Sequence, residues 1–282
     1  MSKPFRDLDL KNSFLFSAAL ADEETCQLVL EIIMGQKLPR VKVHAEHAIL
    51  LNSDFRSVRF DIYADDELFV HYNLEMQNQD NRNIAKRSRY YQAEMDVYSL
   101  KPGEDYSDLK PGYVIFICTF DPFGKKRYRY TFEERCLECD LGLGDETKKI
   151  ILSTKGENEA DVPKQLLNFL KYVEDSTDER AAQIEDETVN RLHKRVTALK
   201  GRRELEASYM TFEELLKDEK AAGREEGHEE GRKAGFELKL MEQIRKKLAK
   251  GQSAGQIAED LLEEPSYISE LIKKMSEPET DM

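Results

Sequence analysis

The sequence predicts an α/β domain followed by a helical C-terminal region. Between Val41 and about Ile151 the chain contains short runs typical of β-strands, interrupted by one helical stretch, and after Pro163 the pattern is helical almost to the end. A chain of 282 residues is long enough for one domain with a sizeable core and an appended region. We expect a core domain over residues 1–175, a helical extension over 176–220 and a separate C-terminal region over 221–282.

The first element expected is a helix that ends at Met34. Asp22 precedes its apolar face as an N-cap, and Gly35 follows it as a C-cap. Six β-type runs and one helix between them follow. The strands are expected at Ala48–Leu51, Val58–Ala64, Leu68–Gln77, Tyr113–Phe120, Tyr128–Phe132 and Lys149–Ser153, and the helix at Asn83–Leu100. The fourth run is apolar at both its odd- and its even-numbered positions, which predicts a central strand covered on both faces.

Helices fill the remainder of the chain. They are expected at Gln165–Val173, at Glu179–Leu199, from Thr211 onward after a capping-box pattern, and as a small helix-turn-helix-like pair between Lys246 and Met275. Gly223, Gly227, Gly231 and Gly235 recur every fourth residue in the third of these segments. The repeat is either a flexible linker or a smooth stripe that lets another backbone approach closely.

Composition excludes several classes of protein. With 35% charged residues and no apolar run near the roughly 20 residues that cross a bilayer, the sequence predicts no membrane span. Charged residues interrupt the N-terminal segment where an export signal would be apolar, so we expect a cytoplasmic protein. Four cysteines are too few for a disulfide framework, and the lone CxxC of Cys136 and Cys139 favours plain buried or half-buried thiols over a metal site.

The charge of the chain bears on whether it can bind nucleic acid. A net charge of -13 argues against a protein that coats nucleic acid nonspecifically, because neutralising phosphates requires Lys and Arg on the contacting face. Basic clusters at 82–89, 125–129 and 191–203 are either solvated faces or local contacts.

The second and third runs carry the candidate site. In both, the even-numbered positions are apolar, so burial of one face places Asp61, Glu75 and Gln77 together on the other. Facing residues must then have numbers with an even sum, which requires an odd loop or a bulge and excludes a two-residue hairpin. Two carboxylates on one sheet face can hold a hard divalent cation. The alternative is a solvated polar face, common in antiparallel sheets.

A resemblance extends this interpretation. Asp61 within RFDIYADD, the triplet Glu75-Met76-Gln77, and Arg87 within KRSRYYQ resemble, in their order and spacing, the PD-(D/E)xK nuclease superfamily and its Rpn branch of recombination-promoting nucleases. The similarity extends through YMTFEELL into the glycine repeat.

The resemblance implies a restriction-endonuclease-like fold, a mixed sheet core flanked by helices. It also implies that Asp61 and Glu75 bind one or two ions of Mg (or Mn or Ca), with the Met76 carbonyl as a further ligand. Gln77 stands where the superfamily usually has Lys, and a neutral amide cannot supply that positive charge. Lys86 on the following helix is the obvious candidate for a substitute, and Glu31 is either the counterpart of the upstream acid that some members use or a paired carboxylate at the rim of its helix.

The function expected from this resemblance is a metal-dependent DNA endonuclease that promotes recombination or DNA mobility. Arg87 and Arg89 are expected to approach the DNA backbone, whereas Tyr90 and Tyr91 are expected to pack between helix and sheet. The alternative is a catalytically weak DNA-binding or assembly protein with a degenerate nuclease fold. In either case we expect a homodimer formed through the C-terminal helices.

Overall fold

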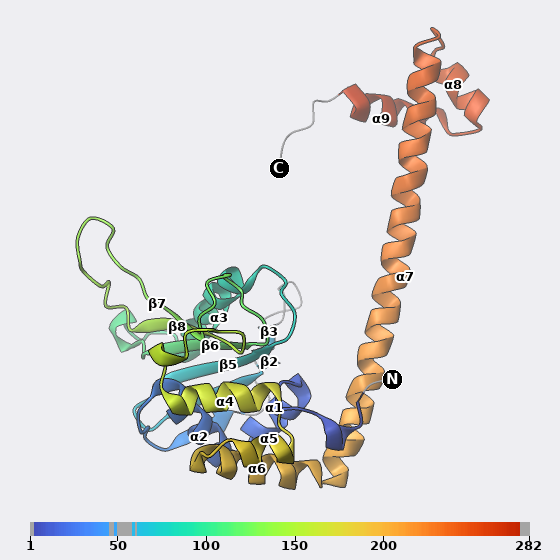
Figure 1. Cartoon of the computed structure of the whole chain (residues 1–282). Helices are drawn as coiled ribbons and strands as arrows, with labels where there is room; N and C mark the ends of the chain where they lie inside the picture. The colour runs from blue at the N-terminus through green and yellow to red at the C-terminus, as the bar shows by residue number, and fades with distance from the viewer. Residues whose placement is uncertain (1–2, 45–47, 50–57, 60, 277–282) are drawn as a thin grey trace. The chain divides into compact units, whose positions relative to one another are not determined.

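The computed structural model describes residues 3–44, 48–49, 58–59 and 61–276, and the chain divides into two compact units, Met1–Met210 and Thr211–Met282. The first unit is a mixed β-sheet with helices on both faces (Figure 1). This is the α/β fold with a helical C-terminal region that the sequence predicts, and its mixed, helix-flanked sheet is consistent with a restriction-endonuclease-like core.

Six strands form the sheet within the described residues, in the order β1-β4-β5-β6-β8-β7. Their bounds are β1 Val41–His44, β4 Ile62–Asp66, β5 His71–Gln77, β6 Gly112–Cys118, β7 Arg129–Phe132 and β8 Thr147–Ser153. β5, β6 and β8 run parallel, and the other three strands pair antiparallel at the edges. β6 lies between β5 and β8 and is fully buried from Val114 to Cys118, as predicted for a central strand. A separate pair joins β2 Ala48–Ile49 to β3 Val58–Arg59.

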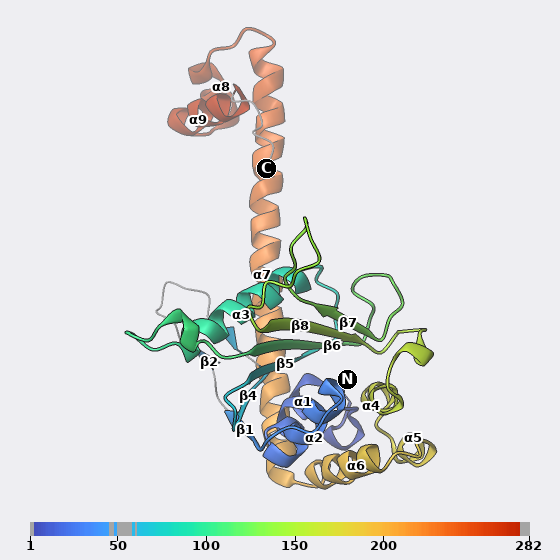
Figure 2. The same ribbon diagram turned by 90° about the vertical axis from the view of Figure 1, so that its left-hand side faces the viewer.

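Helices cover the two sheet faces unequally. α1 (Ser13–Leu20), α2 (Glu23–Met34) and α4 (Lys164–Glu174) lie on one face, and α3 (Ile84–Ser99) lies on the other (Figures 1 and 2). The predicted caps of α2 are confirmed: the Asp22 carboxylate accepts from the Thr25 N–H at 2.9 Å, and Gly35 takes a left-handed φ of 71°. Three short 3-10 helices, Phe5–Asp7, Tyr106–Asp108 and Glu159–Asp161, lie in connections.

The core on the α3 face positions the candidate site. Its buried members come from β4, β6, β8 and α3: Tyr63, Tyr91, Met95, Val114, Phe116, Cys118 and Ile151. Because side chains alternate along a strand, the same face of β5 presents Asn73, Glu75 and Gln77 beneath α3. The face that carries the candidate acids is therefore covered by a helix rather than solvated.

The predicted parity of the hairpin is confirmed. Asp65 faces His71, so the facing numbers have an even sum, and the turn is not a two-residue hairpin. The Asp66 carboxylate closes the turn by accepting from the N–H groups of Leu68 at 2.9 Å and Val70 at 3.1 Å. Phe69 adopts a positive φ of 61°. Leu68 and Phe69, expected in a strand, are exposed turn residues, and β5 begins at His71.

Other boundaries differ from expectation where a local feature overrides the pattern. The predicted strand Val58–Ala64 is interrupted, because Asp61 lies in a bend between β3 and β4. Of the predicted strand Ala48–Leu51, only Ala48–Ile49 falls within the described residues. α1 is not among the expected elements, and β1 lies at the start of the expected β region without being one of its six expected strands.

The predicted helix Glu179–Leu199 is two helices, α5 (Asp178–Gln183) and α6 (Glu187–Lys200). The chain breaks before Asp186, whose carboxylate caps α6 by accepting from the N–H groups of Thr188 at 2.9 Å and Val189 at 3.2 Å. α7 (Arg203–Leu248) begins eight residues before Thr211, so the expected capping box lies inside a continuous helix. No glycine or proline stands between Arg203 and Thr211 to stop it.

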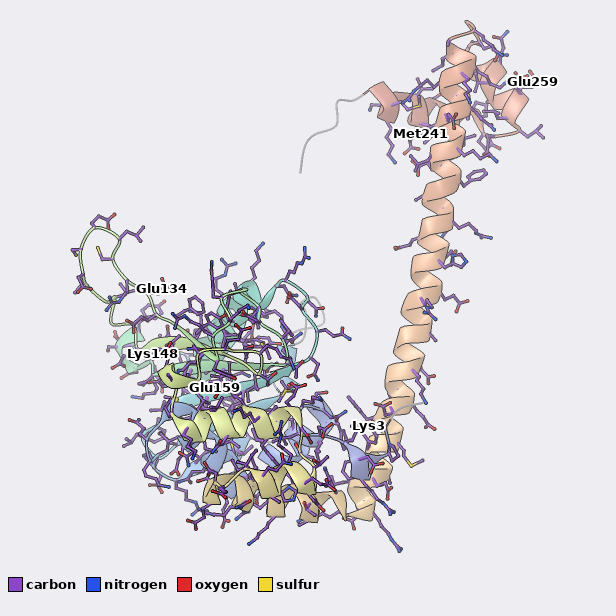
Figure 3. The ribbon with its side chains drawn as sticks, viewed as in Figure 1. Lys3, Glu134, Lys148, Glu159, Met241 and Glu259 are labelled. Carbon is purple, nitrogen blue, oxygen red and sulfur yellow. The ribbon has the colours of Figure 1, made fainter. Side chains whose placement is uncertain are left out.

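In the second unit, the C-terminal part of α7 packs with α8 (Ala254–Leu261) and α9 (Pro265–Ser276), the pair of helices expected there. Their shared core consists of Leu240, Ile244, Ile257, Ala258, Ile268 and Leu271. Met241 packs against it from α7 (Figure 3). α7 also runs as helix through the glycine repeat, and no described atom lies within 4 Å of a Cβ built on Gly223, Gly227, Gly231 or Gly235.

Candidate nuclease site

The site forms where the bend before β4 meets the end of β5. Antiparallel pairing of Ile62 with Leu74 brings Asp61 beside Glu75 and Met76. The Asp61 main-chain N–H donates to Glu75 Oε1 at 3.0 Å, and the Met76 N–H donates to Asp61 Oδ2 at 2.9 Å. Each acid is thus held by the backbone beside the other. The structure brings together the two carboxylates that the sequence singled out.

Glu75 is a buried acid. It is 3% exposed, and its Oε1 also accepts from the Asn73 side-chain amide at 3.0 Å. Burial, and then the nearby Asp61 carboxylate, raise the pKa of Glu75 well above its ordinary value of 4.5, although hydrogen bonds from Asn73 and the Asp61 N–H and the charge of Arg87 oppose the shift. The protein therefore offsets the negative charge of ionised Glu75 only in part, and an added cation would stabilise the ionised form.

Arg87 of α3 reaches the same place. Its Nη1 donates to Gln77 Oε1 at 2.6 Å, and its Nη2 lies 3.4 Å from Glu75 Oε2 and 2.8 Å from the Tyr91 hydroxyl. Tyr91 in turn stacks on Phe116 with the ring centroids 5.9 Å apart. Tyr91 packs between helix and sheet as expected, but Tyr90 is 40% exposed.

The other two basic residues of α3 lie away from the acids. Lys86, the expected substitute for the missing lysine, is exposed, and Arg87 rather than Lys86 contacts Glu75. Arg89 is also exposed, at a small hollow of about 260 Å³ that Phe123 and Phe132 line. Arg89 is therefore accessible to a large ligand from solvent.

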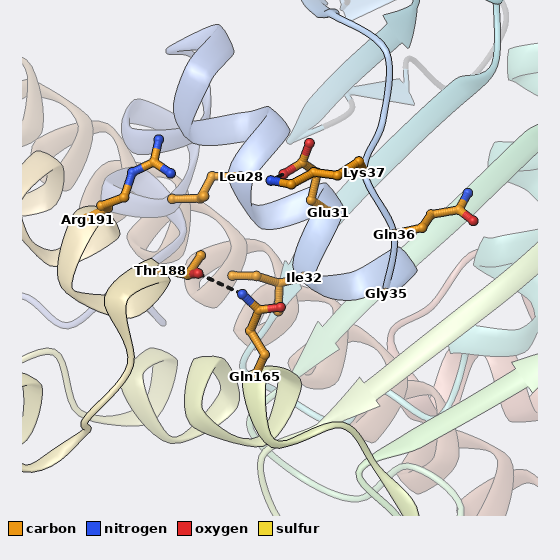
Figure 4. Close-up of a pocket in the computed structure, with 9 residues that line it drawn as sticks. All are labelled: Leu28, Glu31, Ile32, Gly35, Gln36, Lys37, Gln165, Thr188 and Arg191. Atoms are coloured by element: carbon orange, nitrogen blue, oxygen red, sulfur yellow. Dashed lines mark hydrogen bonds and ion pairs between the residues drawn. The ribbon is translucent and has the colours of Figure 1, made fainter.

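Glu31 is not part of this cluster. It lies on α2, on the sheet face opposite α3, and its carboxylate is 2.6 Å from Lys37 Nζ (Figure 4). The Leu38 N–H and Gln27 also donate to it, and these contacts lower the pKa of Glu31 despite its partial burial. The structure gives Glu31 the paired environment of a structural carboxylate.

The donor set suits a hard divalent cation. Asp61 and Glu75 offer carboxylate oxygens, and the N–H and C=O of one strand residue point to the same side, so the Met76 carbonyl faces the Asp61 side as its N–H does. Within the described residues no group of three or more His, Cys, Asp or Glu side chains could hold a metal. Any ion here would complete its shell with main-chain oxygen, water or substrate. Of the CxxC thiols, Cys136 is half-buried, whereas Cys139 is exposed rather than covered.

Two features of the site were missed at the level of sequence. The contact of Arg87 with Gln77 was not foreseen, although Arg87 and Tyr91 are spaced to share one helix face. The second feature is Asn73, on the same strand face as Glu75. It is fully buried, and among the described residues its Oδ1 has no hydrogen-bond partner.

Comparisons with known proteins address the family. No curated protein and no solved structure matches the chain. In the described part of the chain, no helix has the length and apolar character needed to traverse a bilayer. A sequence model of the PD-(D/E)XK nuclease family transposases matches residues 10–226, which is more than half of the chain and contains every residue of the site. The chain belongs to the PD-(D/E)XK nuclease family transposases.

Proposed function

We propose that this protein is a metal-dependent DNA endonuclease that hydrolyses phosphodiester bonds and promotes recombination or DNA mobility. Membership of the nuclease family supports the reaction class. The observation that carries the proposal is the pairing of two acids: the Asp61 N–H donates to buried Glu75, and the Met76 N–H donates to the half-buried Asp61 carboxylate. A polar strand face without such a role would have no reason to bury Glu75 beside a second carboxylate.

Asp61 and Glu75 are the proposed ligands of one or two Mg ions, for which Mn or Ca can substitute. A bound divalent ion supplies Lewis acidity, which lowers the pKa of water and neutralises charge on a phosphoryl group. The Met76 N–H holds the Asp61 carboxylate, and the Asn73 amide orients Glu75. Gln77 completes the catalytic triplet at the end of β5.

DNA is the proposed substrate. Arg87 lies at the acids, and Arg89, two residues further along α3, is exposed. Guanidinium groups bind phosphate oxygens with several N–H donors at once. These two side chains provide local positive charge despite the acidic composition of the whole chain.

The test is nicking of supercoiled plasmid by wild type and Asp61→Asn, with Mg, Mn, Ca or EDTA. The isosteric amide can still accept from the Met76 N–H, so the variant should fold. We expect it to lose at least about 100-fold of the cutting rate, which is the scale of removing one transition-state contact. Asp80→Asn is the matched control, because Asp80 is exposed in the loop after the site. Equal nicking by wild type and Asp61→Asn would refute the proposal.

A second candidate is a DNA-binding or assembly protein with weak or no nuclease activity. The neutral Gln77 and the ion pair of Arg87 with Glu75 favour it, because that pair already neutralises part of the acid charge. Metal-independent DNA binding without nicking by the wild type would support this function instead.

A homodimer through the C-terminal helices is also proposed. The glycine repeat forms an exposed small-residue stripe on α7, and Phe236 and Leu238 beside it are 57% and 68% exposed. Two active sites in one particle would also serve cutting of both DNA strands. Light scattering of the full chain and of a truncation before Gly223 tests this, and an unchanged oligomer after truncation contradicts it.

A further inference from the structure

The Arg87 guanidinium is fixed at the acid pair by an unusual number of contacts. It donates to Gln77, Tyr91 and Glu75, and of these the contact with Gln77 is shortest at 2.6 Å and the contact with Glu75 longest at 3.4 Å. Its central carbon also lies 5.3 Å from the ring centroids of both Tyr91 and Phe116. The cation is therefore held in place before any ligand binds.

Arg87 also remains accessible. Its side chain is 28% exposed, whereas that of Glu75 is 4% exposed. The three described hydrogen bonds leave two of the five N–H donors of a guanidinium without a described acceptor. A phosphate oxygen can accept from such donors at the mouth of the site.

The contacts of Gln77 explain why a neutral side chain stands at position 77. Its Oε1 accepts from Arg87, and its Nε2 donates to the Gln79 carbonyl at 2.6 Å, so both ends of the amide are used. A lysine at 77 could not accept from Arg87 and would set a second positive charge beside it. A carboxylate there would add a third acid to a site that already holds two. An amide satisfies both neighbours without either cost.

We propose that Arg87 supplies the positive charge that stabilises the reacting phosphate, and that Gln77 is the residue that positions it. This inference rests on the proposed nuclease function. It separates Arg87 from Arg89, whose exposed side chain contacts DNA away from the reacting group. It also predicts that positions 77 and 87 are interchangeable as sources of charge, provided that only one of them is cationic.

The test is a charge swap measured by single-turnover and steady-state nicking. Arg87→Met should lower kcat by about 100- to 1000-fold, as expected for loss of a charge in the transition state. Gln77→Lys alone should lower kcat by at least 10-fold, because the added ammonium group repels the Arg87 guanidinium from its position beside the acids. The double variant Gln77→Lys with Arg87→Met should regain at least 10-fold over Arg87→Met. Lys86→Met, a cation lost from the exposed neighbouring position, should stay within about 3-fold of wild type.

DNA affinity in EDTA, measured by fluorescence anisotropy, distinguishes this role from simple phosphate binding. We expect Arg87→Met to weaken DNA binding by less than about 10-fold, far less than it lowers kcat, since the charge acts chiefly in the transition state. A tenfold loss of affinity with unchanged kcat overturns the proposal, and so does a double variant no faster than Arg87→Met. If Arg87→Met does not fold, the double variant alone decides, and a folded double variant without cleavage overturns the proposal. Failure of the nuclease function itself is recognised separately, by equal nicking with Asp61→Asn.

Discussion

The main-chain N–H of Asp61 donates to the Glu75 carboxylate over 3.0 Å, so one acid orients the other through the backbone rather than through a side chain. This contact places Glu75 in a buried position whose charge the protein offsets only in part. The site is therefore electrostatically incomplete.

The first prediction is that Glu75→Gln stabilises the metal-free protein at alkaline pH. The folded-state pKa of Glu75 is raised, so its contribution to stability is fully present below the ordinary value of 4.5 and is lost as the pH rises through the raised pKa. Gln mimics the protonated acid and escapes this loss. At pH 8 we expect a gain of about 1 to 3 kcal/mol, or several degrees in Tm.

Thermal melts in EDTA at pH 5 and pH 8 test this first prediction. The gain should be small at pH 5 and larger at pH 8. Glu67→Gln is the matched control, because Glu67 is an exposed acid in the turn of the same hairpin. An identical shift at both pH values would show that the change is not electrostatic.

The second prediction is that divalent ions stabilise the wild type through this site. A ligand that binds only the folded state adds about 2.7 kcal/mol at 100 times its Kd. Mn should raise the Tm of wild type and of the exposed control Asp80→Asn, and should leave Asp61→Asn nearly unchanged. Binding should also release protons, because Glu75 must ionise to act as a ligand. A Tm rise of equal size in Asp61→Asn would place the ion elsewhere.

Sequence periodicity was most informative in the strands where apolar and polar residues alternate regularly. The alternation through Tyr72, Leu74 and Met76 predicted the parity of the hairpin and brought Asp61 to Glu75. It could not predict that α3 covers the other face, because burial of Asn73 and Glu75 depends on how α3 packs back onto the sheet, which alternation within one strand does not specify. The contact between Arg87 and Gln77 arises from that same packing, so it lay beyond any local pattern.

Short elements were missed for a different reason. α1 has only eight residues and is apolar nearly all round, so its sequence carries little helical periodicity. β1 has four residues, of which only Val41 is fully buried. The split between α5 and α6 depended on one capping carboxylate, and such a residue within a polar stretch is hard to distinguish from a solvated acid.

The third prediction concerns that cap. Asp186→Ala removes acceptors for the N–H groups of Thr188 and Val189 and for the Asn168 amide at 3.1 Å. Loss of an N-cap costs about 1 kcal/mol, so the urea midpoint should fall while the m-value stays constant. Glu185→Ala, at an exposed neighbour outside the cap, should have little effect. An unchanged midpoint for Asp186→Ala would mean that α6 is held by packing alone.

The fourth prediction uses the glycine repeat of α7. Replacing Gly223, Gly227, Gly231 and Gly235 with alanine meets no described atom within 4 Å in one chain, and should stabilise the isolated helix by up to about 1 kcal/mol per position. In a dimer that packs through this stripe, four added methyl groups would separate the backbones. We therefore expect greater helicity by circular dichroism together with a weaker dimer by light scattering.

The control for the glycine variant is the pair Glu225→Ala and Lys233→Ala. At 100° per residue each position lies about 160° around the helix from the two nearest glycines of the stripe, and their joint removal leaves the net charge unchanged. The control should keep the wild-type oligomer, because it adds no bulk to the stripe. If the glycine variant gains helicity and also keeps the wild-type dimer, then the dimer does not use the stripe, and the glycines serve only to lower the stability of an exposed helix.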